Sequence, residues 1–133
     1  MKKDIDFPKV EGVSMAITRQ RNRESNEYDY FVYLINDKDE VLENVLVNSY
    51  GYSKNQETKT STLRHFVEEV APLSSYRVEP IMPDLFKLVN RYWVSFYIDG
   101  QVYDKKFIFV PDSITDKNFS FLESVQLEGV LHA

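Results

Sequence analysis

The sequence contains no cysteine and only two histidines, His65 and His132. The missing thiols exclude disulfide bonds, thiolate metal ligands and a cysteine nucleophile together, and they fit a reducing compartment. His65 stands close to Glu68 and Glu69, and His132 is the penultimate residue. Neither histidine lies in a recognisable catalytic or metal-binding motif. We interpret His65 as a surface residue and expect no zinc site.

Glycine is also scarce, and the four glycines lie far apart, at Gly12, Gly51, Gly100 and Gly129. Neither of the phosphate-binding motifs G-x-G-x-x-G and G-x-x-x-x-G-K-[ST] can be written from glycines so dispersed. The serine motifs G-x-S-x-G and S-x-x-K are missing as well. We therefore expect a protein without catalytic activity and without a cofactor.

Long apolar runs are missing too. No window approaches the roughly 18 apolar residues that a membrane span needs. The N-terminal "MKKDIDFPKV" has aspartates where a signal peptide needs its apolar region. The net charge of −5 disfavours general affinity for nucleic-acid phosphates. These features predict a cytoplasmic protein without membrane attachment, for which nucleic acid is not the first expected partner.

One cluster of oxygen ligands occurs in "NDKDE" at 36–40. Asn36, Asp37, Asp39 and Glu40 offer hard oxygen donors of the kind that bind Ca²⁺. The glycine that an EF-hand loop requires does not follow them, and Asn and Asp are also common in turns. We predict a solvated hairpin turn and no metal site.

Aromatic residues, by contrast, make up 14% of the chain and are dense in "YWVSFYIDGQVYDKKFIFV" at 92–110. The Asp99-Gly100 pair predicts a two-residue hairpin loop, because both positions of a type I′ turn need a positive φ. Such a loop places Tyr92 opposite Phe107. The face expected in the core comprises Tyr92, Val94, Phe96, Ile98, Tyr103, Phe107 and Phe109. The half-exposed face comprises Trp93, Ser95, Tyr97, Val102, Asp104 and Lys106.

Further strands are predicted by similar patterns at 13–18, 28–35, 41–52 and 76–81. We expect 28–35 to pair with 41–52 across the 36–40 turn. With 92–98 and 101–109, and with 60–71 if it is extended, this gives about seven strands. The sequence therefore predicts an all-β single domain over 1–133, an antiparallel two-sheet sandwich of immunoglobulin or fibronectin type.

The segment 60–71 is ambiguous. Its apolar residues at i, i+3, i+4 and i+7 (Leu63, Phe66, Val67 and Val70) suit an amphipathic helix. The threonines and serines that precede them, in a chain rich in β-branched residues, favour a strand. We favour the strand and leave the helix open.

The C-terminal tail, 111–133, has turn residues first and then scattered apolar residues of poor periodicity. We expect it to add an edge strand, to wrap the sandwich or to dock on a partner.

Aromatic residues outside the predicted core suggest a function. Trp93 and Tyr97 lie on the half-exposed face of the hairpin, and Phe119 and Phe121 lie in the tail. Trp and Tyr are favoured anchors at protein interfaces, and an open sheet edge accepts a strand from another chain. We predict a non-enzymatic protein–protein interaction module that uses these four residues. Its partner is another protein or a second copy of the chain.

An alternative follows from "TRQRNR" at 18–23, in which Arg19, Arg21 and Arg23 alternate and project to one side of an extended backbone. Tyr28 and Tyr30 follow and are suited to stacking on bases. The alternative function is single-stranded nucleic-acid binding, against which the interrupting glutamates and the acidic chain argue.

The pattern "KKDIDFPKVEGVSMAI…YLINDKDEVLENVLVNSYGY…KTSTLRHFVEEV…YWVSFYIDGQVYDKKFIFVPDSI…EGVL" resembles a small family of uncharacterised bacterial proteins labelled phenylalanyl-tRNA synthetase alpha subunit-related. A class II synthetase carries a Phe-Arg-x-Glu motif and a later glycine-rich motif that ends in arginine. Here Arg64 follows Leu63, and the dispersed glycines do not form the second motif. We therefore expect the label without aminoacylation, and no synthetase residue is carried over.

Overall fold

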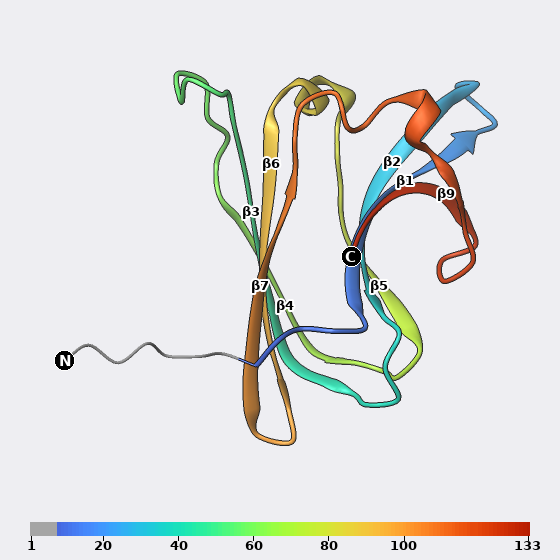
Figure 1. Cartoon of the computed structure of the whole chain (residues 1–133). Helices are drawn as coiled ribbons and strands as arrows, with labels where there is room; N and C mark the ends of the chain where they lie inside the picture. The colour runs from blue at the N-terminus through green and yellow to red at the C-terminus, as the bar shows by residue number, and fades with distance from the viewer. Residues whose placement is uncertain (1–7) are drawn as a thin grey trace.

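The computed structural model of the chain describes residues 8–133. Residues 1–7, in the segment where the sequence argues against a signal peptide, lie outside the described residues. Within the described range, nine strands form two antiparallel sheets packed face to face (Figure 1). This confirms the predicted all-β two-sheet sandwich, with two more strands than the seven expected.

The first sheet has the strand order β5-β2-β1-β9-β8. Its strands are β1 (Val13–Asn22), β2 (Glu27–Asn36), β5 (Ser74–Pro80), β8 (Ser120–Leu122) and β9 (Leu127–His132). The second sheet has the order β4-β3-β6-β7. Its strands are β3 (Leu42–Tyr52), β4 (Leu63–Val70), β6 (Val89–Ile98) and β7 (Gln101–Phe109).

Seven of these strands follow the immunoglobulin- and fibronectin-like arrangement. β1, β2 and β5 lie together in one sheet, and β3, β4, β6 and β7 form the other. β8 and β9 extend the first sheet beyond β1, with which β9 pairs directly. The tail at 111–133 therefore adds two strands to the first sheet. Of the three outcomes expected for the tail, the structure shows the addition of strands at a sheet edge.

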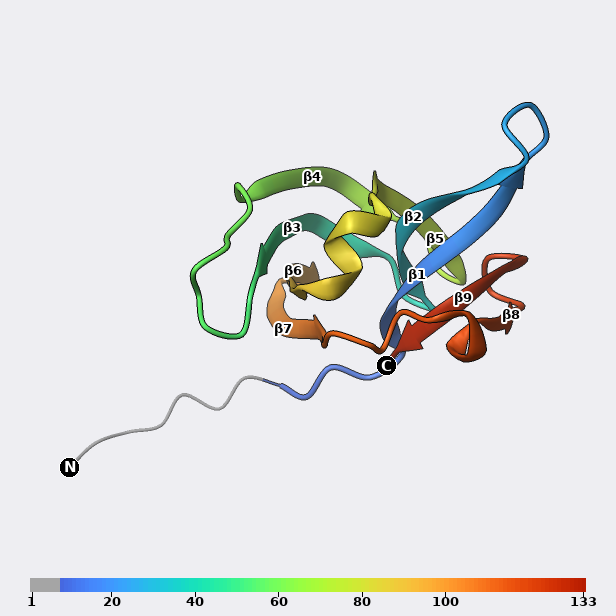
Figure 2. The same ribbon diagram turned by 90° about the horizontal axis from the view of Figure 1, so that it is seen from above.

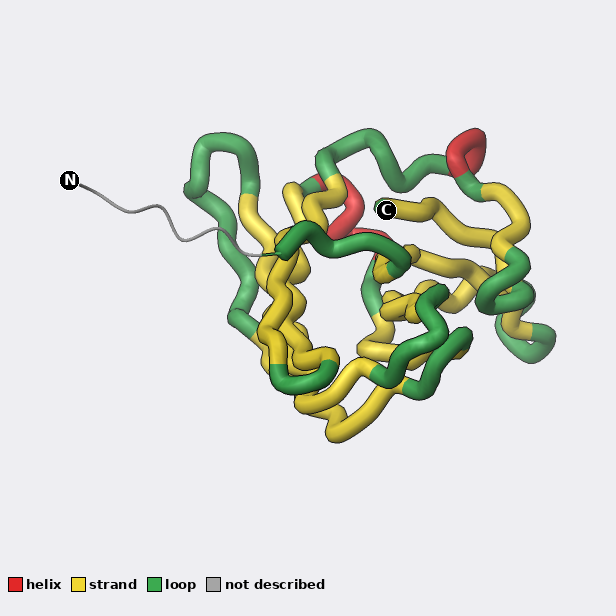
Figure 3. The backbone as a smooth tube through the Cα atoms, turned by 60° about the horizontal axis from the view of Figure 1, so that its bottom comes forward, coloured by secondary structure: helices red, strands yellow, loops and turns green. Residues whose placement is uncertain are grey.

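Within residues 8–133, helix is confined to two short segments in the connections, η1 (Pro83–Lys87) and η2 (Asp116–Asn118) (Figure 3). η1 lies over one end of the sandwich, between the two layers (Figure 2). Neither segment has the length or apolar character that a membrane-crossing helix needs.

The hairpin of β6 and β7 has the predicted register. Asp99 and Gly100 have φ values of 49° and 79°, as a type I′ turn requires, and Tyr92 lies opposite Phe107. Tyr92, Phe96 and Phe107 are among the largest fully buried side chains. Most of the aromatic surface in 92–110 therefore fills the core.

β4 confirms the strand over the helix for segment 60–71. Its residues alternate along the edge of the second sheet, with His65 beside Val47 and Phe66 beside Leu46. His65 and Val67 face the first sheet, while Phe66 faces solvent. The helical spacing of the apolar residues was coincidental, because Phe66 is 59% exposed.

The expected pairing of 28–35 with 41–52 is wrong, because β2 and β3 belong to different sheets. The 36–40 segment crosses between the sheets and is not a hairpin turn. Asn36 is fully buried there, and its amide donates to the carbonyls of Glu40 (2.9 Å), Val70 (3.3 Å) and Ala71 (3.0 Å). A crossing connection uses the same turn-forming residues as a hairpin, so composition alone does not distinguish the two.

β5 contains a bulge at Val78. Glu79 pairs with Val32 and Arg77 pairs with Tyr33, which leaves Val78 as the extra residue. Strict alternation would direct Glu79 outward beside Arg77. The bulge turns both Val78 and Glu79 toward the second sheet.

Candidate functional site

The outward-facing side of the second sheet, called the outer face below, carries large side chains. Tyr92, Val94 and Phe96 point into the core, so alternation directs the residues between them outward. Four cross-strand rows result. The rows are Tyr50, Arg91 and Ile108; Arg64, Asn48, Trp93 and Lys106; Phe66, Leu46, Ser95 and Asp104; and Glu69, Glu43, Tyr97 and Val102.

Several apolar side chains on the outer face are exposed. Trp93, Tyr97 and Ile108 are each 40% exposed, and Phe66 is 59% exposed. Single exposed apolar residues are ordinary, but a group of them on one sheet face marks an interaction surface. Trp93 and Tyr97 therefore lie where the sequence places them, on the exposed side of the hairpin.

A shallow depression of about 220 Å³ lies beside Trp93, lined by Leu46, Asn48, Ser95 and Asp104. The Lys106 ammonium lies 4.6 Å from the centroid of the Trp93 ring. This cation–π contact holds one side of the indole. The other side faces a hollow of the size that a large side chain of a partner fills.

Charge on the outer face is divided along the strands. Arg64, Arg91 and Lys106 occupy the rows of Arg91 and Trp93, called the basic rows. Asp104, Glu43 and Glu69 occupy the rows of Ser95 and Tyr97, called the acidic rows, and Glu68 follows Phe66 on β4. Within residues 8–133, none of these seven side chains forms an ion pair.

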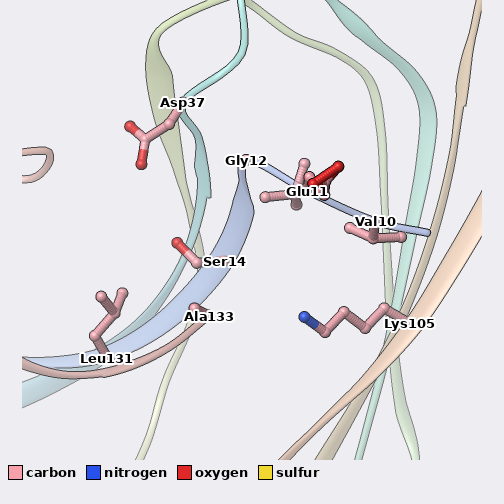
Figure 4. A pocket seen from close by; sticks show the side chains of 9 residues that line it. Val10, Glu11, Gly12, Ser14, Asp37, Lys105, Leu131 and Ala133 are labelled. Carbon is pink, nitrogen blue, oxygen red and sulfur yellow. The ribbon is translucent and has the colours of Figure 1, made fainter.

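The sheet edges are less suited to strand addition than the sequence suggests. β8 has three residues, β5 ends in Pro80, and β4 carries charged residues along its length. On β7, Lys105 points toward the space between the sheets and lines a pocket of about 360 Å³ beside Ala133 (Figure 4). Short strands, proline and inward charges all discourage edge pairing. The outer face is thus the stronger candidate for contact.

The two tail residues predicted as contacts occupy different environments. Phe119 is half-buried, with the Arg19 guanidinium 4.4 Å from its ring centroid and the Tyr30 ring 6.1 Å away. Phe121, on β8, is 59% exposed. The structure therefore brings Trp93 and Tyr97 together on one sheet and places both tail residues with the other sheet.

Of the three arginines of the alternative, Arg19 and Arg21 lie together, with their guanidinium carbons 4.6 and 4.8 Å from the centroid of the Tyr28 ring. Arg19 Nε donates to Glu128 (2.8 Å) and its NH1 donates to Asp116 (3.0 Å). Burial lowers the pKa of Arg19, but the hydrogen bond and charge of Glu128 outweigh this effect and leave the pKa raised. Arg21 donates to the Asn26 carbonyl, and Arg23 lies in the turn after β1. One of the three charges is therefore already neutralised by carboxylates.

A buried polar cluster around Glu79 was not predicted. Its carboxylate, on β5, contacts His65 Nε2 (2.6 Å) and accepts from the Ser49 hydroxyl (3.1 Å) and the Tyr92 hydroxyl (3.4 Å). The three partners lie on β4, β3 and β6, so the cluster connects the two sheets. Burial, followed by the Glu79 carboxylate, raises the pKa of Tyr92. His65 is therefore half-buried and not the surface residue we expected.

This cluster does not have the geometry of a catalytic triad. In a triad the histidine lies between the nucleophile and the acid, whereas here Ser49 and His65 both contact the same carboxylate. The second histidine, His132, has its ring edge-on to Phe107 and Phe109 at 5.3 and 5.7 Å between centroids. Among the described residues, no group of three or more His, Asp or Glu side chains is arranged to hold a metal ion.

No family model matches the chain, and neither a curated protein nor a solved structure with significant similarity to it was found. The resemblance to proteins with the synthetase label therefore stays a prediction. The function has to be inferred from the residues of this chain.

Proposed function

We propose that this protein is a non-enzymatic protein–protein interaction module and that the outer face of the second sheet is its contact surface. The observation that carries the proposal is the joint exposure of Trp93 and Tyr97 on the sheet face that also carries the exposed Phe66. Aromatic anchors beside a hollow, surrounded by charged residues, are typical of binding hot spots. The missing cysteines fit a cytoplasmic location.

The proposal of a non-enzymatic role is supported by the partners of the two histidines. His65 is bound to Glu79, and His132 packs against two phenylalanine rings. Within residues 8–133, neither histidine is hydrogen-bonded to a serine hydroxyl as a general base must be. Both arrangements have a structural explanation in joining the sheets and in filling the core.

Nucleic-acid binding has less support. The Arg19 guanidinium is occupied by Asp116 and Glu128, and the chain carries a net charge of −5. A groove that follows a phosphate backbone needs several free cationic side chains. We therefore keep it as an alternative that a binding titration decides.

The experiment is affinity recovery of bound proteins from the native host with three tagged chains. These are the wild type, a Trp93→Ser/Tyr97→Ser variant, and Met82→Ser as the matched control. Met82 is 67% exposed and lies in the connection after β5, away from the outer face. We expect specific partners to be lost with the double variant and kept with the control.

Equal recovery by all three chains would contradict the proposal. Both replaced residues of the double variant are exposed, so we expect it to remain folded. A thermal melt of each variant checks this point. A Phe121→Ser variant, measured in parallel, tests whether β8 contributes to the contact.

A further inference from the structure

The charge pattern of the outer face points to one kind of partner, and this inference rests on the proposed function. The basic rows lie toward one end of the strands, the acidic rows toward the other, and Trp93 lies near the boundary. A surface with basic residues in one half and acidic residues in the other is complementary to a copy of itself turned end for end.

We propose that the outer face binds the outer face of a second copy of this chain. The two-fold axis lies in the plane of the interface, parallel to the rows, between the rows of Trp93 and Ser95. This axis reverses the strand direction, so each basic row faces an acidic row. A two-fold axis along the strands would instead place each basic row over the same basic row, which like charges disfavour.

The proposed axis makes specific pairs. Lys106 lies over Asp104 of the second copy, because their rows exchange and both residues are on β7. Arg64 lies over Phe66 of the second copy and within reach of its Glu68, which is two residues further along β4. Aligned sheets pack within about 30° of each other, so these correspondences hold near the axis.

Along β6, two aromatic residues lie in the interface. Trp93 of each copy lies over Ser95 of the other, at the depression that Leu46 and Asn48 help to line. Arg91 lies over Tyr97 of the second copy, a cation–π geometry. Five of the seven outer-face charges thus face a group of suitable chemistry on the second copy, and Glu43 lies over its Tyr50.

The size of the face predicts a weak dimer. Four strands about 4.8 Å apart and about ten residues long give a flat area of roughly 600 Å² per copy. The two copies together reach about 1,200 Å², the lower end of specific interfaces. The net charge of −5 on each chain also opposes association. We expect a Kd on the order of 10 µM.

Two charge-reversal variants test the dimer. One is Arg64→Glu/Lys106→Glu, which makes both members of the Arg64–Glu68 and Lys106–Asp104 contacts acidic. The other is Glu68→Lys/Asp104→Lys, which makes both members of these contacts basic. Sedimentation velocity over roughly 5–500 µM measures association of each variant, of the wild type and of an equimolar mixture of the two variants.

The wild type is expected to dimerise, and each variant alone is expected to bind itself about tenfold or more weakly. The mixture is expected to regain the wild-type affinity, because every reversed charge then faces its opposite. That recovery also shows that both variants are folded.

Three results would overturn the proposal. A wild type that stays monomeric at the highest concentration rules out the dimer. This result leaves the outer face as a contact surface for another protein, which the recovery experiment with Trp93→Ser/Tyr97→Ser tests separately. Variants that dimerise as well as the wild type place the interface elsewhere. A mixture that fails to associate, with the wild type dimeric, rules out the axis.

Discussion

Replacement of Glu79 by alanine tests how the two sheets are held together at their β4–β5 side. Glu79 is the only member of its cluster that belongs to the first sheet, and its side chain is 9% exposed. The substitution leaves the hydroxyls of Ser49 and Tyr92 without their acceptor in an environment that water barely reaches.

The cost follows from these contacts. An unpaired buried hydroxyl at Ser49 costs about 2 kcal/mol, and the longer 3.4 Å contact of Tyr92 contributes about 1 kcal/mol. The one lost methylene group adds about 0.8 kcal/mol. We add nothing for His65, whose side chain is 28% exposed and regains water. The expected loss is therefore about 4 kcal/mol, within the usual range for breaking a buried pair.

Urea unfolding at pH 7, followed by far-ultraviolet circular dichroism, measures this loss. Glu79→Gln keeps one acceptor oxygen and is expected to cost about 2 kcal/mol, half of the alanine value. Glu69→Ala replaces an exposed glutamate on β4 and is the control, with an expected change below about 0.5 kcal/mol. If Glu79→Ala is as mild as the control, the cluster does not stabilise the sandwich and the reasoning is refuted.

Three further outcomes are expected. Because the pKa of Tyr92 is raised in the folded state, above about pH 10 the unfolded chain loses a proton that the folded chain keeps, and stability falls by up to about 1.4 kcal/mol per pH unit. Tyr92→Phe should reduce the pH dependence of the free energy of unfolding, measured by urea titrations between about pH 10 and 11.5. An equal pH dependence for the wild type and the variant would contradict the buried environment of Tyr92. Asn36→Asp removes the amide donors of a fully buried side chain and should lower the free energy of unfolding in urea by about 3 kcal/mol or more. The control Asn44→Asp replaces an exposed side chain and should be near neutral. Similar changes in the free energy of unfolding for both variants would mean that Asn36 does not hold the crossing between the sheets. Fluorescence anisotropy with a labelled single-stranded oligonucleotide at low salt should show no binding. The nucleic-acid alternative would be restored by binding that weakens steeply with salt and disappears in the variant Arg19→Ala/Arg21→Ala/Arg23→Ala.

Much of the fold follows from local pattern. The Asp99-Gly100 turn determines the register of β6 and β7, and that register alone places Trp93 and Tyr97 outside the core. The strand assignment of 60–71 was correct because alternation outweighs a four-residue helical coincidence in an edge strand.

Long-range arrangement was harder to predict. The composition of 36–40 indicates a turn, but whether a turn joins neighbours or crosses between sheets depends on which strands pair, as the burial of Asn36 illustrates. The inward position of Glu79 depends on a bulge that no residue of β5 announces. Phe119 was expected at the surface, but the tail strands carry it under Arg19.

Only part of the proposed contact surface could be predicted from the sequence. Its β6 residues follow from the hairpin, whereas Phe66 and Leu46 join them only once β4 and β3 are known to lie beside β6. The division into basic and acidic rows is a property of the cross-strand register. In the linear sequence the same seven charges are scattered between positions 43 and 106.

Trp93 is the single tryptophan of the chain and lies at the middle of the proposed interface, so its fluorescence reports on the contact without any label. Acrylamide quenching of this fluorescence, measured over the concentration range in which sedimentation detects association, should decrease as the chain associates, because the indole becomes covered. Association with unchanged quenching of Trp93 would show that the outer face stays open to solvent and would contradict its role as the contact surface.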